Sequence, residues 1–219
     1  MKSDYIIFDL DDTLASELHY LQSAFRHSAA RIDYCSKEGL YENMMRWYHQ
    51  KDNVFAKIIE RYPQEQLDFL LSEYRDHMPS MALHDGAEEL LHTLKSRQCK
   101  LGLISDGRST TQRNKLKALG IENMFDQIII SGEFGSEKPD ERNFRAFMSP
   151  DISTYFYVAD NPKKDFITPN RLGWTTVCLL NAGHNIHPQN FTGSDQYLPA
   201  HKINHLSELI PLMDSLSSL

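Results

Sequence analysis

Two carboxylates stand two residues apart at the end of an apolar run. Asp9 and Asp11 follow directly after the run from Tyr5 to Phe8. Such a run, ended by polar residues, predicts a strand covered on both faces, and open parallel sheets bind ligands beyond the carboxyl ends of their strands. In extended chain, residues i and i+2 point the same way, so both carboxylates face one site. Because like charges this close favour a bound cation, the pair predicts catalysis; an acidic turn that caps the next helix is the alternative.

The segment from Asp9 to Thr13 reads D-L-D-D-T. It fits the D-x-D-x-T signature of the haloacid dehalogenase superfamily, which this chain resembles. Three further matches follow in the family's order: a strand ending in Ser105, Lys138 before Pro139, and Asp160 with Asp165 in the spacing D-x-x-x-x-D. The resemblance covers nearly the whole chain outside residues 15–80. It departs from the family at Ala159 and Asp106, where Gly and Asn are usual, and neither change removes a reacting group.

The resemblance implies chemistry for the acidic residues. Asp9 would attack phosphorus and form an aspartyl phosphate, while Asp11 would act as general acid and then as general base. Mg²⁺ would be held by the Asp9 carboxylate, the Asp11 backbone carbonyl, Asp160 and a phosphate oxygen. The alternative for Asp160 is a cap on the following helix, a role that is compatible with metal binding.

The resemblance also implies a phosphate-binding group, made of Ser105, Asp106, Gly107 and Lys138. The Ser105 hydroxyl and the backbone amides after it would donate to phosphate oxygens. Lys138 would act catalytically by placing a positive charge beside the transferred phosphoryl group. Asp165 is expected outside the metal's own ligands, where it orients a metal-bound water or holds Lys138. A solvated carboxylate in the first turn of a helix is its alternative.

Strands and helices alternate in the second half of the chain. Apolar runs predict strands at residues 100–104, 126–130, 154–159 and 174–180, with helices near 109–119, 140–148 and 162–172 between them. Within the first of these helices, packing and solvation account for Gln112 and Lys115. A last amphipathic helix runs from Leu206 to Leu216, with Pro211 confined to its first turn. The alternation predicts an α/β fold with a doubly wound parallel sheet, a Rossmann-like core.

Residues 15–80 show helical periodicity and no strand pattern. The sequence therefore predicts two domains: an α/β core made of residues 1–14 and 81–219, and an inserted helical cap domain of residues 15–80. Insertion directly after the first strand resembles the first subclass of the family.

Composition excludes some partners. The 219 residues carry a formal net charge of −7, which argues against nucleic acid and anionic membrane surfaces as partners. The chain has no apolar run long enough to span a bilayer, and it enters its first strand too early for a signal peptide, so a cytoplasmic location is expected. The sequence leaves the oligomeric state open.

We expect a magnesium-dependent phosphatase that hydrolyses a small phosphomonoester. The sequence around Asp165 is most similar to the branch that contains N-acylneuraminate-9-phosphatase and pyrimidine 5′-nucleotidases, which indicates a sugar phosphate or a nucleotide. The alternatives are a dehalogenase, which also uses an aspartate nucleophile, and a non-catalytic phospho-receiver or binding protein. Asp11, Asp160 and Asp165 argue against a dehalogenase, because a departing halide needs neither a proton nor magnesium.

Overall fold

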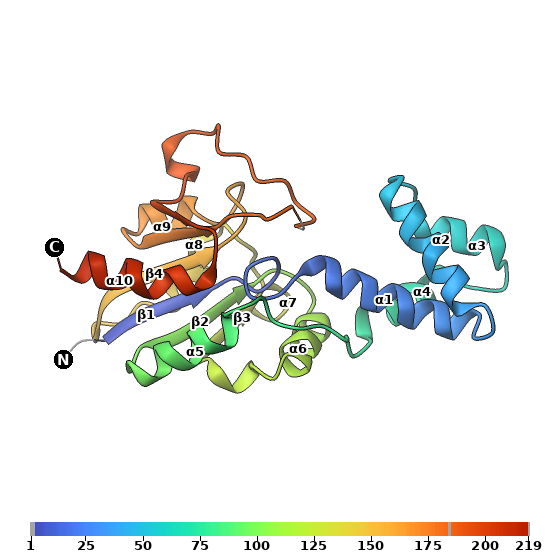
Figure 1. Cartoon of the computed structure of the whole chain (residues 1–219), viewed down its shortest axis with the longest axis horizontal. Coiled ribbons are helices and arrows are strands. Elements are labelled where there is room, and N and C mark those ends of the chain that lie inside the picture. The colour runs from blue at the N-terminus through green and yellow to red at the C-terminus, as the bar shows by residue number, and fades with distance from the viewer. Residues whose placement is uncertain (1–2, 184, 219) are drawn as a thin grey trace.

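The core of the molecule is a six-stranded parallel sheet (Figure 1). The computed structural model describes residues 3–183 and 185–218. Its strands are β1 (Ser3–Phe8), β2 (Lys100–Ser105), β3 (Gln127–Ile130), β4 (Ile152–Ala159), β5 (Thr175–Leu179) and β6 (His201–Ile203). Their order in the sheet is β3-β2-β1-β4-β5-β6, and all neighbours pair in parallel. The predicted doubly wound α/β fold and its four strands from residue 100 onward are confirmed.

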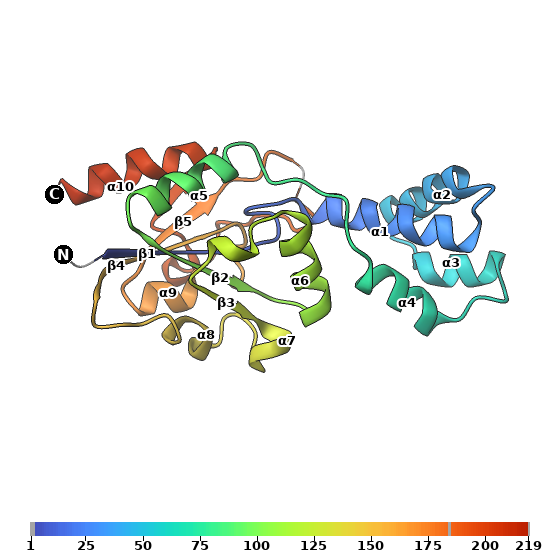
Figure 2. The same cartoon turned by 90° about the horizontal axis from the view of Figure 1, so that it is seen from below.

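Helices cover both faces of this sheet. They are α5 (Ala87–Ser96), α6 (Ser109–Ala118), α7 (Ser131–Phe134), α8 (Glu141–Arg145), α9 (Ile167–Arg171) and α10 (Leu209–Ser217). Along β1 the side chains alternate: Ile6 and Phe8 join one buried cluster with α5 and α10, while Tyr5 and Ile7 join another with α8. Figure 2 shows α5 and α10 on the side of the sheet opposite α8 and α9. A strand buried on both faces explains why its sequence is continuously apolar.

Some predicted elements differ from those in the structure. Strand β6 was not predicted, since it has three residues and two of them, His201 and Lys202, are polar. The helix expected at 162–172 begins only at Ile167, because the chain after β4 first forms turns that bring Asp165 inward. The C-terminal helix is confirmed: a short 3₁₀ turn (Leu206–Glu208) leads into α10, where Pro211 lies in the first turn.

Residues 15–80 contain four helices and no strand: α1 (Glu17–Ile32), α2 (Lys37–His49), α3 (Val54–Arg61) and α4 (Leu67–Asp76). These helices bury a hydrophobic cluster of their own, which includes Phe25, Met44 and Ile58. Figure 1 shows them projecting beyond the sheet, past the ends of the central strands. Ala15 bridges to both Asp11 and Leu83, so the segments that leave and re-enter the core lie side by side.

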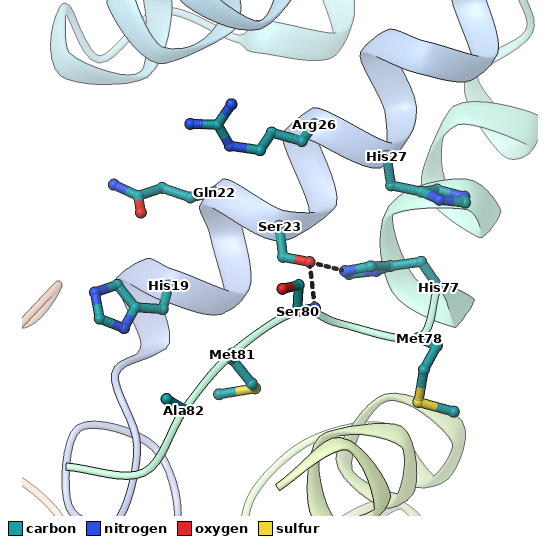
Figure 3. Close-up of a pocket in the computed structure, with 10 residues that line it drawn as sticks. All are labelled: His19, Gln22, Ser23, Arg26, His27, His77, Met78, Ser80, Met81 and Ala82. Carbon is teal, nitrogen blue, oxygen red and sulfur yellow. Dashed lines mark hydrogen bonds between the residues drawn. The ribbon is translucent and has the colours of Figure 1, made fainter.

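A cavity of about 640 Å³ lies where α1 meets the returning segment 77–82 (Figure 3). Ser23 closes this junction: its Oγ accepts the Ser80 backbone N–H at 2.8 Å and lies 3.1 Å from His77 Nε2. None of the residues that line this cavity belongs to the four family motifs. Among the described helices, none is both long and apolar enough to cross a membrane.

Candidate active site

The motif residues meet at the point in the sheet where the strand order reverses, between β1 and β4. In the order β3-β2-β1-β4-β5-β6, the connections after β1 and β4 run to opposite sides and leave a crevice at the carboxyl ends of these strands. Asp9 continues β1 by one residue, since its backbone N–H donates to the Val158 carbonyl oxygen at 2.9 Å. Asp160 directly follows β4. The two side chains, which are 151 residues apart in sequence (160 − 9), are thereby brought together.

Asp9 is paired with a buried lysine. Lys138 Nζ lies 2.9 Å from Asp9 Oδ1 and 2.8 Å from Asp165 Oδ1, and the lysine side chain is fully buried. Burial alone would lower the pKa of Lys138, but the charges of Asp165 and Asp9 outweigh it and raise this pKa well above its usual range. Lys138 is therefore a fixed positive charge beside the expected nucleophile.

The buried acidic groups favour a cation. Asp9, Asp160 and Asp165 each offer a carboxylate oxygen within 4.8 Å of the others. Burial, with the charge of Asp165 adding to it, raises the pKa of Asp9 to about 6 although Lys138 opposes this. Burial and the charges of Asp9 and Asp165 raise the pKa of Asp160 to about 8. Burial and mutual repulsion make the ionised forms of these carboxylates unfavourable, and a divalent ion would offset this. Their oxygens are hard donors of the kind that Mg²⁺ prefers.

The oxygens of Asp165 are already engaged. Its Oδ1 also accepts the Tyr157 hydroxyl at 3.2 Å, and its Oδ2 accepts the Asn161 backbone N–H at 3.1 Å. Asp165 is fully buried, so the solvated carboxylate considered from the sequence is wrong. Within the described part of the chain, by contrast, Asp9 Oδ2 and Asp160 Oδ1 make no hydrogen bond. This arrangement favours Asp9 and Asp160 as ligands, with Asp165 holding Lys138.

Asp11 faces helix α6. Its Oδ1 lies 2.6 Å from Lys115 Nζ, and its Oδ2 lies 2.9 Å from the Gln112 amide nitrogen. Gln112 and Lys115 are 2% and 3% exposed, so solvation does not account for either residue. Sequence reasoning missed both residues. Their signal was their three-residue spacing in the helix after Ser105, which places them on one face, toward the turn after β1.

The turn after β2 holds the expected phosphate-binding residues. Ser105 Oγ is buried 2.8 Å from the Gln112 amide nitrogen, and the Gly107 N–H donates to Ser131 Oγ at 2.9 Å. Gly107 has φ 147°, a conformation that side chains rarely adopt. The Asp106 carboxylate accepts the Lys138 backbone N–H at 3.0 Å, so this turn also positions the lysine.

Lys164 and Glu17 also line the acidic crevice, and Asn185 binds one of its carboxylates. Lys164 Nζ lies 2.7 Å from Asp106 Oδ2, and Asn185 donates its amide to Asp160 Oδ2 at 2.8 Å. Burial and the charge of Asp11 raise the pKa of Glu17, the first residue of α1, to about 7. Lys164 lies within the motif from Asp160 to Asp165, but the sequence predicted no role for it. Asn185 lies in an irregular loop after β5, and no sequence pattern predicted its contact with Asp160. The acidic crevice holds a cavity of about 80 Å³, much smaller than the one at the α1 junction.

This fold and this cluster of charges define a class of hydrolase. Residues 6–178 match the family described as haloacid dehalogenase-like hydrolase. The chain belongs to this family, so the resemblance drawn from the four motifs is confirmed.

Several known proteins are similar to this chain. A glyceraldehyde 3-phosphate phosphatase of Methanocaldococcus jannaschii is 27% identical, over 96% of this chain and 97% of its own. A pyrimidine 5′-nucleotidase of Escherichia coli is 30% identical over 55% of both chains. Among solved structures, the haloacid dehalogenase-like hydrolase YfnB of Bacillus subtilis superposes with a TM-score of 0.70 at 20% identity, covering 98% of this chain and 100% of that one. At this identity the structural similarity concerns the fold alone.

Proposed function

We propose that this protein is a phosphatase that hydrolyses a small phosphomonoester through an aspartyl phosphate on Asp9. The observation that carries the proposal is the buried group of Asp9, Lys138, Asp160 and Asp165 at the switch point of the sheet. The curated relatives support it, since those named above and a phosphoserine phosphatase of Thermus thermophilus are named for phosphate ester hydrolysis.

In the proposed reaction Asp9 attacks phosphorus through a carboxylate oxygen, and the leaving alcohol departs with its electron pair and a proton from Asp11. Water then hydrolyses the aspartyl phosphate, with Asp11 taking the proton. Lys138 stabilises the charge on the transferred group and holds Asp9, while Asp165 holds Lys138. The Ser105 hydroxyl and the backbone amide of Asp106 are proposed to bind phosphate oxygens, whereas the Gly107 N–H already donates to Ser131 Oγ.

We propose Mg²⁺ as the cofactor, held by the carboxylates of Asp9 and Asp160 and by the Asp11 backbone carbonyl. When bound, the ion would offset the negative charge of the buried carboxylates and of the substrate phosphate. Asn185 would fix the orientation of Asp160 through the hydrogen bond to Oδ2.

We infer that residues 15–80 act as a cap domain over a core of residues 1–14 and 81–219. Three observations support this inference: a separate hydrophobic cluster in α1–α4, adjacent exit and return segments at Ala15, and the place of Glu17 on the border of the crevice. A cap in this place would exclude water and contact the leaving group.

A small sugar phosphate is the favoured substrate class. The glyceraldehyde 3-phosphate phosphatases of Methanocaldococcus jannaschii and Methanopyrus kandleri align over nearly the full length of both chains, cap region included, whereas the nucleotidase aligns over about half. Nucleoside monophosphates are the second candidates. A dehalogenase remains the alternative from another reaction class.

The test is phosphate release from a panel of sugar phosphates, nucleoside monophosphates and p-nitrophenyl phosphate. We expect turnover with Mg²⁺, little turnover with Ca²⁺, whose larger and looser coordination misplaces the reacting groups, and none after chelation. Chloride release from a 2-chloro acid is measured in parallel. Chloride release without phosphate release would overturn the proposal, and so would full phosphatase activity after exhaustive chelation.

A further inference from the structure

Helix α6 carries two adjoining rows of polar side chains with different partners. Gln112 and Lys115 face the catalytic turn after β1, where both of their side-chain nitrogens contact the Asp11 carboxylate. Thr111 and Asn114 form the neighbouring row, which contacts the end of α4. Since residues three apart lie on one face of a helix, each row acts as a unit.

The Asp11 carboxylate is held at both oxygens. Lys115 donates to Oδ1 and Gln112 to Oδ2, so neither rotation nor withdrawal of the carboxylate is possible without breaking one of these contacts. The Gln112 nitrogen also lies 2.8 Å from Ser105 Oγ and from the Asp106 carbonyl oxygen, which ties the position of Asp11 to the turn expected to bind phosphate. Proton transfer requires a carboxylate within hydrogen-bond reach, so this fixation bears directly on catalysis.

The cap side of the structure holds Lys115 in turn. Its Nζ lies 4.3 Å from the centre of the Tyr20 ring, and the lysine is 3% exposed. Tyr20 belongs to α1, and its hydroxyl donates to the Tyr74 carbonyl oxygen of α4 at 3.0 Å. Thr111 Oγ1 donates to the Arg75 carbonyl oxygen at 2.9 Å, and the Asn114 side-chain amide donates to the Asp76 carbonyl oxygen at 3.0 Å. Helix α6 therefore also caps the end of α4.

We propose that Lys115 is a positioning residue for Asp11 and that Tyr20 makes its position depend on the placement of α1. Lys115 contacts neither the phosphorus nor the leaving group; it acts by fixing the carboxylate that transfers protons. The inference rests on the proposed phosphatase function.

The test uses a leaving group that needs no proton. With p-nitrophenyl phosphate, Asp9 attacks phosphorus, the bond from phosphorus to the phenolic oxygen breaks, and p-nitrophenolate leaves with the electron pair. Asp11 is needed only afterwards, when water attacks the aspartyl phosphate and gives up a proton. Rapid mixing of the full-length enzyme with substrate and Mg²⁺ therefore separates the two steps.

For Lys115→Met we expect a burst of p-nitrophenolate at a rate close to wild type, followed by a steady state slowed about 10²-fold. The phosphorylated enzyme should accumulate and be visible by intact mass spectrometry. Lys117→Met is the matched control, since Lys117 is an exposed lysine on the same helix, and it should behave as wild type. Equal slowing of burst and steady state by Lys115→Met, or no slowing of either, would overturn the inference.

A second pair of variants keeps the inference testable if Lys115→Met fails to fold. Tyr20→Leu removes the ring beside Lys115 and should also slow the steady state more than the burst, whereas Tyr20→Phe keeps the ring and should retain the wild-type ratio. Equal ratios in both variants would remove Tyr20 from the proposal. If wild-type enzyme releases no phosphate from any ester, the proposed function fails instead, and the two failures are thereby distinguished.

Discussion

Asp9 lies close to three other charged side chains of the site. The carboxylate contacts Lys138, and it offers an oxygen within 4.8 Å of carboxylate oxygens of Asp160 and Asp165. The proposed mechanism needs both oxygens of Asp9, one for phosphorus and one for the metal ion: Lys138 contacts Oδ1, and Oδ2 makes no hydrogen bond among the described residues. Asn in place of Asp removes the charge and keeps the shape of the side chain, so such a substitution tests the charge by itself.

Asp9→Asn should abolish turnover and leave the fold intact. The amide preserves the shape of the side chain but is no nucleophile, and loss of a nucleophile typically costs about 10⁴-fold or more in kcat. Phosphate release in the presence of excess Mg²⁺ measures the loss, and circular dichroism with thermal melting verifies the fold. Turnover comparable to wild type would contradict the covalent mechanism.

Stability should depend on pH and on Mg²⁺ together. The pKa values of Asp9, about 6, and Asp160, about 8, lie above the ordinary value of 3.8. Their contribution to folding is therefore full below about pH 4 and is lost as the pH rises through 6 and 8. Because Mg²⁺ binds the ionised carboxylates, it should raise the Tm more above pH 8 than at pH 6. Thermal melts with and without chelator measure this.

The control for this pH effect is Asp160→Asn, which removes the carboxyl group with the higher of the two pKa values. Most of the pH-dependent difference in the Mg²⁺ response should disappear in this variant. An unchanged difference would assign the effect to other groups.

At the scale of single elements, the loop after β5 reaches back to the site. Asn185 binds Asp160 Oδ2, and Gln189 donates to the Asp160 carbonyl oxygen at 2.6 Å. Asn185→Ala should weaken Mg²⁺ binding by about 10- to 100-fold, because residues that orient metal ligands contribute this much to affinity. Titration of activity or of Tm with Mg²⁺ measures the change. Asn190→Ala, an exposed asparagine in the same loop, should leave the affinity unaltered.

Strand β2 contains a glycine, Gly102, at a position where the neighbouring side chains leave no room for a Cβ atom. A Cβ at Gly102 would lie 2.5 Å from Phe147 Cε1 and 3.1 Å from Ile7 Cγ1. Gly102→Ala should therefore destabilise the protein by about 1–3 kcal/mol through overpacking. Gly39→Ala in α2 is the opposite case, with no atom within 4 Å of the new Cβ, and it should stabilise by about 0.5–1 kcal/mol. Denaturant unfolding compares the two, and equal signs would contradict this packing argument.

At the scale of the whole molecule, two parts of the core meet the helices of residues 15–80. Helix α6 binds the end of α4, and Ile186 from the loop after β5 packs against the cluster of α1–α4. The crevice is lined by residues of the sheet's loops and by Glu17 of α1. Side chains from both parts of the chain reach it.

Substrate choice should be set by the helical part. None of the core motifs is expected to reach beyond the bridging oxygen of a phosphate ester, so the leaving group must be recognised elsewhere. Glu17 borders the crevice, and burial together with the charges of Glu17 and Asp12 raises the pKa of Tyr48, so both side chains are candidates for contact with the leaving group. We expect Glu17→Ala and Tyr48→Ala to change the ranking of substrates by kcat/KM, by about 10-fold between the best pair, while slow hydrolysis of p-nitrophenyl phosphate persists. An unchanged ranking in these variants, with changes in Arg108→Ala or Ile186→Ala, would place specificity in the core loops.

The sequence by itself determined five of the six strands and the positions of the motif residues at their ends. Apolar runs of three or more residues marked β1 to β5, because strands buried on both faces leave little room for polar side chains. Polar residues at the ends of those runs predicted where Asp9, Ser105 and Asp160 would meet, since the carboxyl ends of parallel strands share one edge of the sheet.

Only the tertiary structure decided which side chains hold those residues. Lys115, Gln112 and Asn185 contact Asp11 or Asp160 across more than 20 residues of sequence. A lysine or an amide on a helix or in a loop has the same local pattern whether it is solvated or buried against a carboxylate. The difference arises from packing between distant segments, which desolvates these side chains and leaves them the carboxylates as partners.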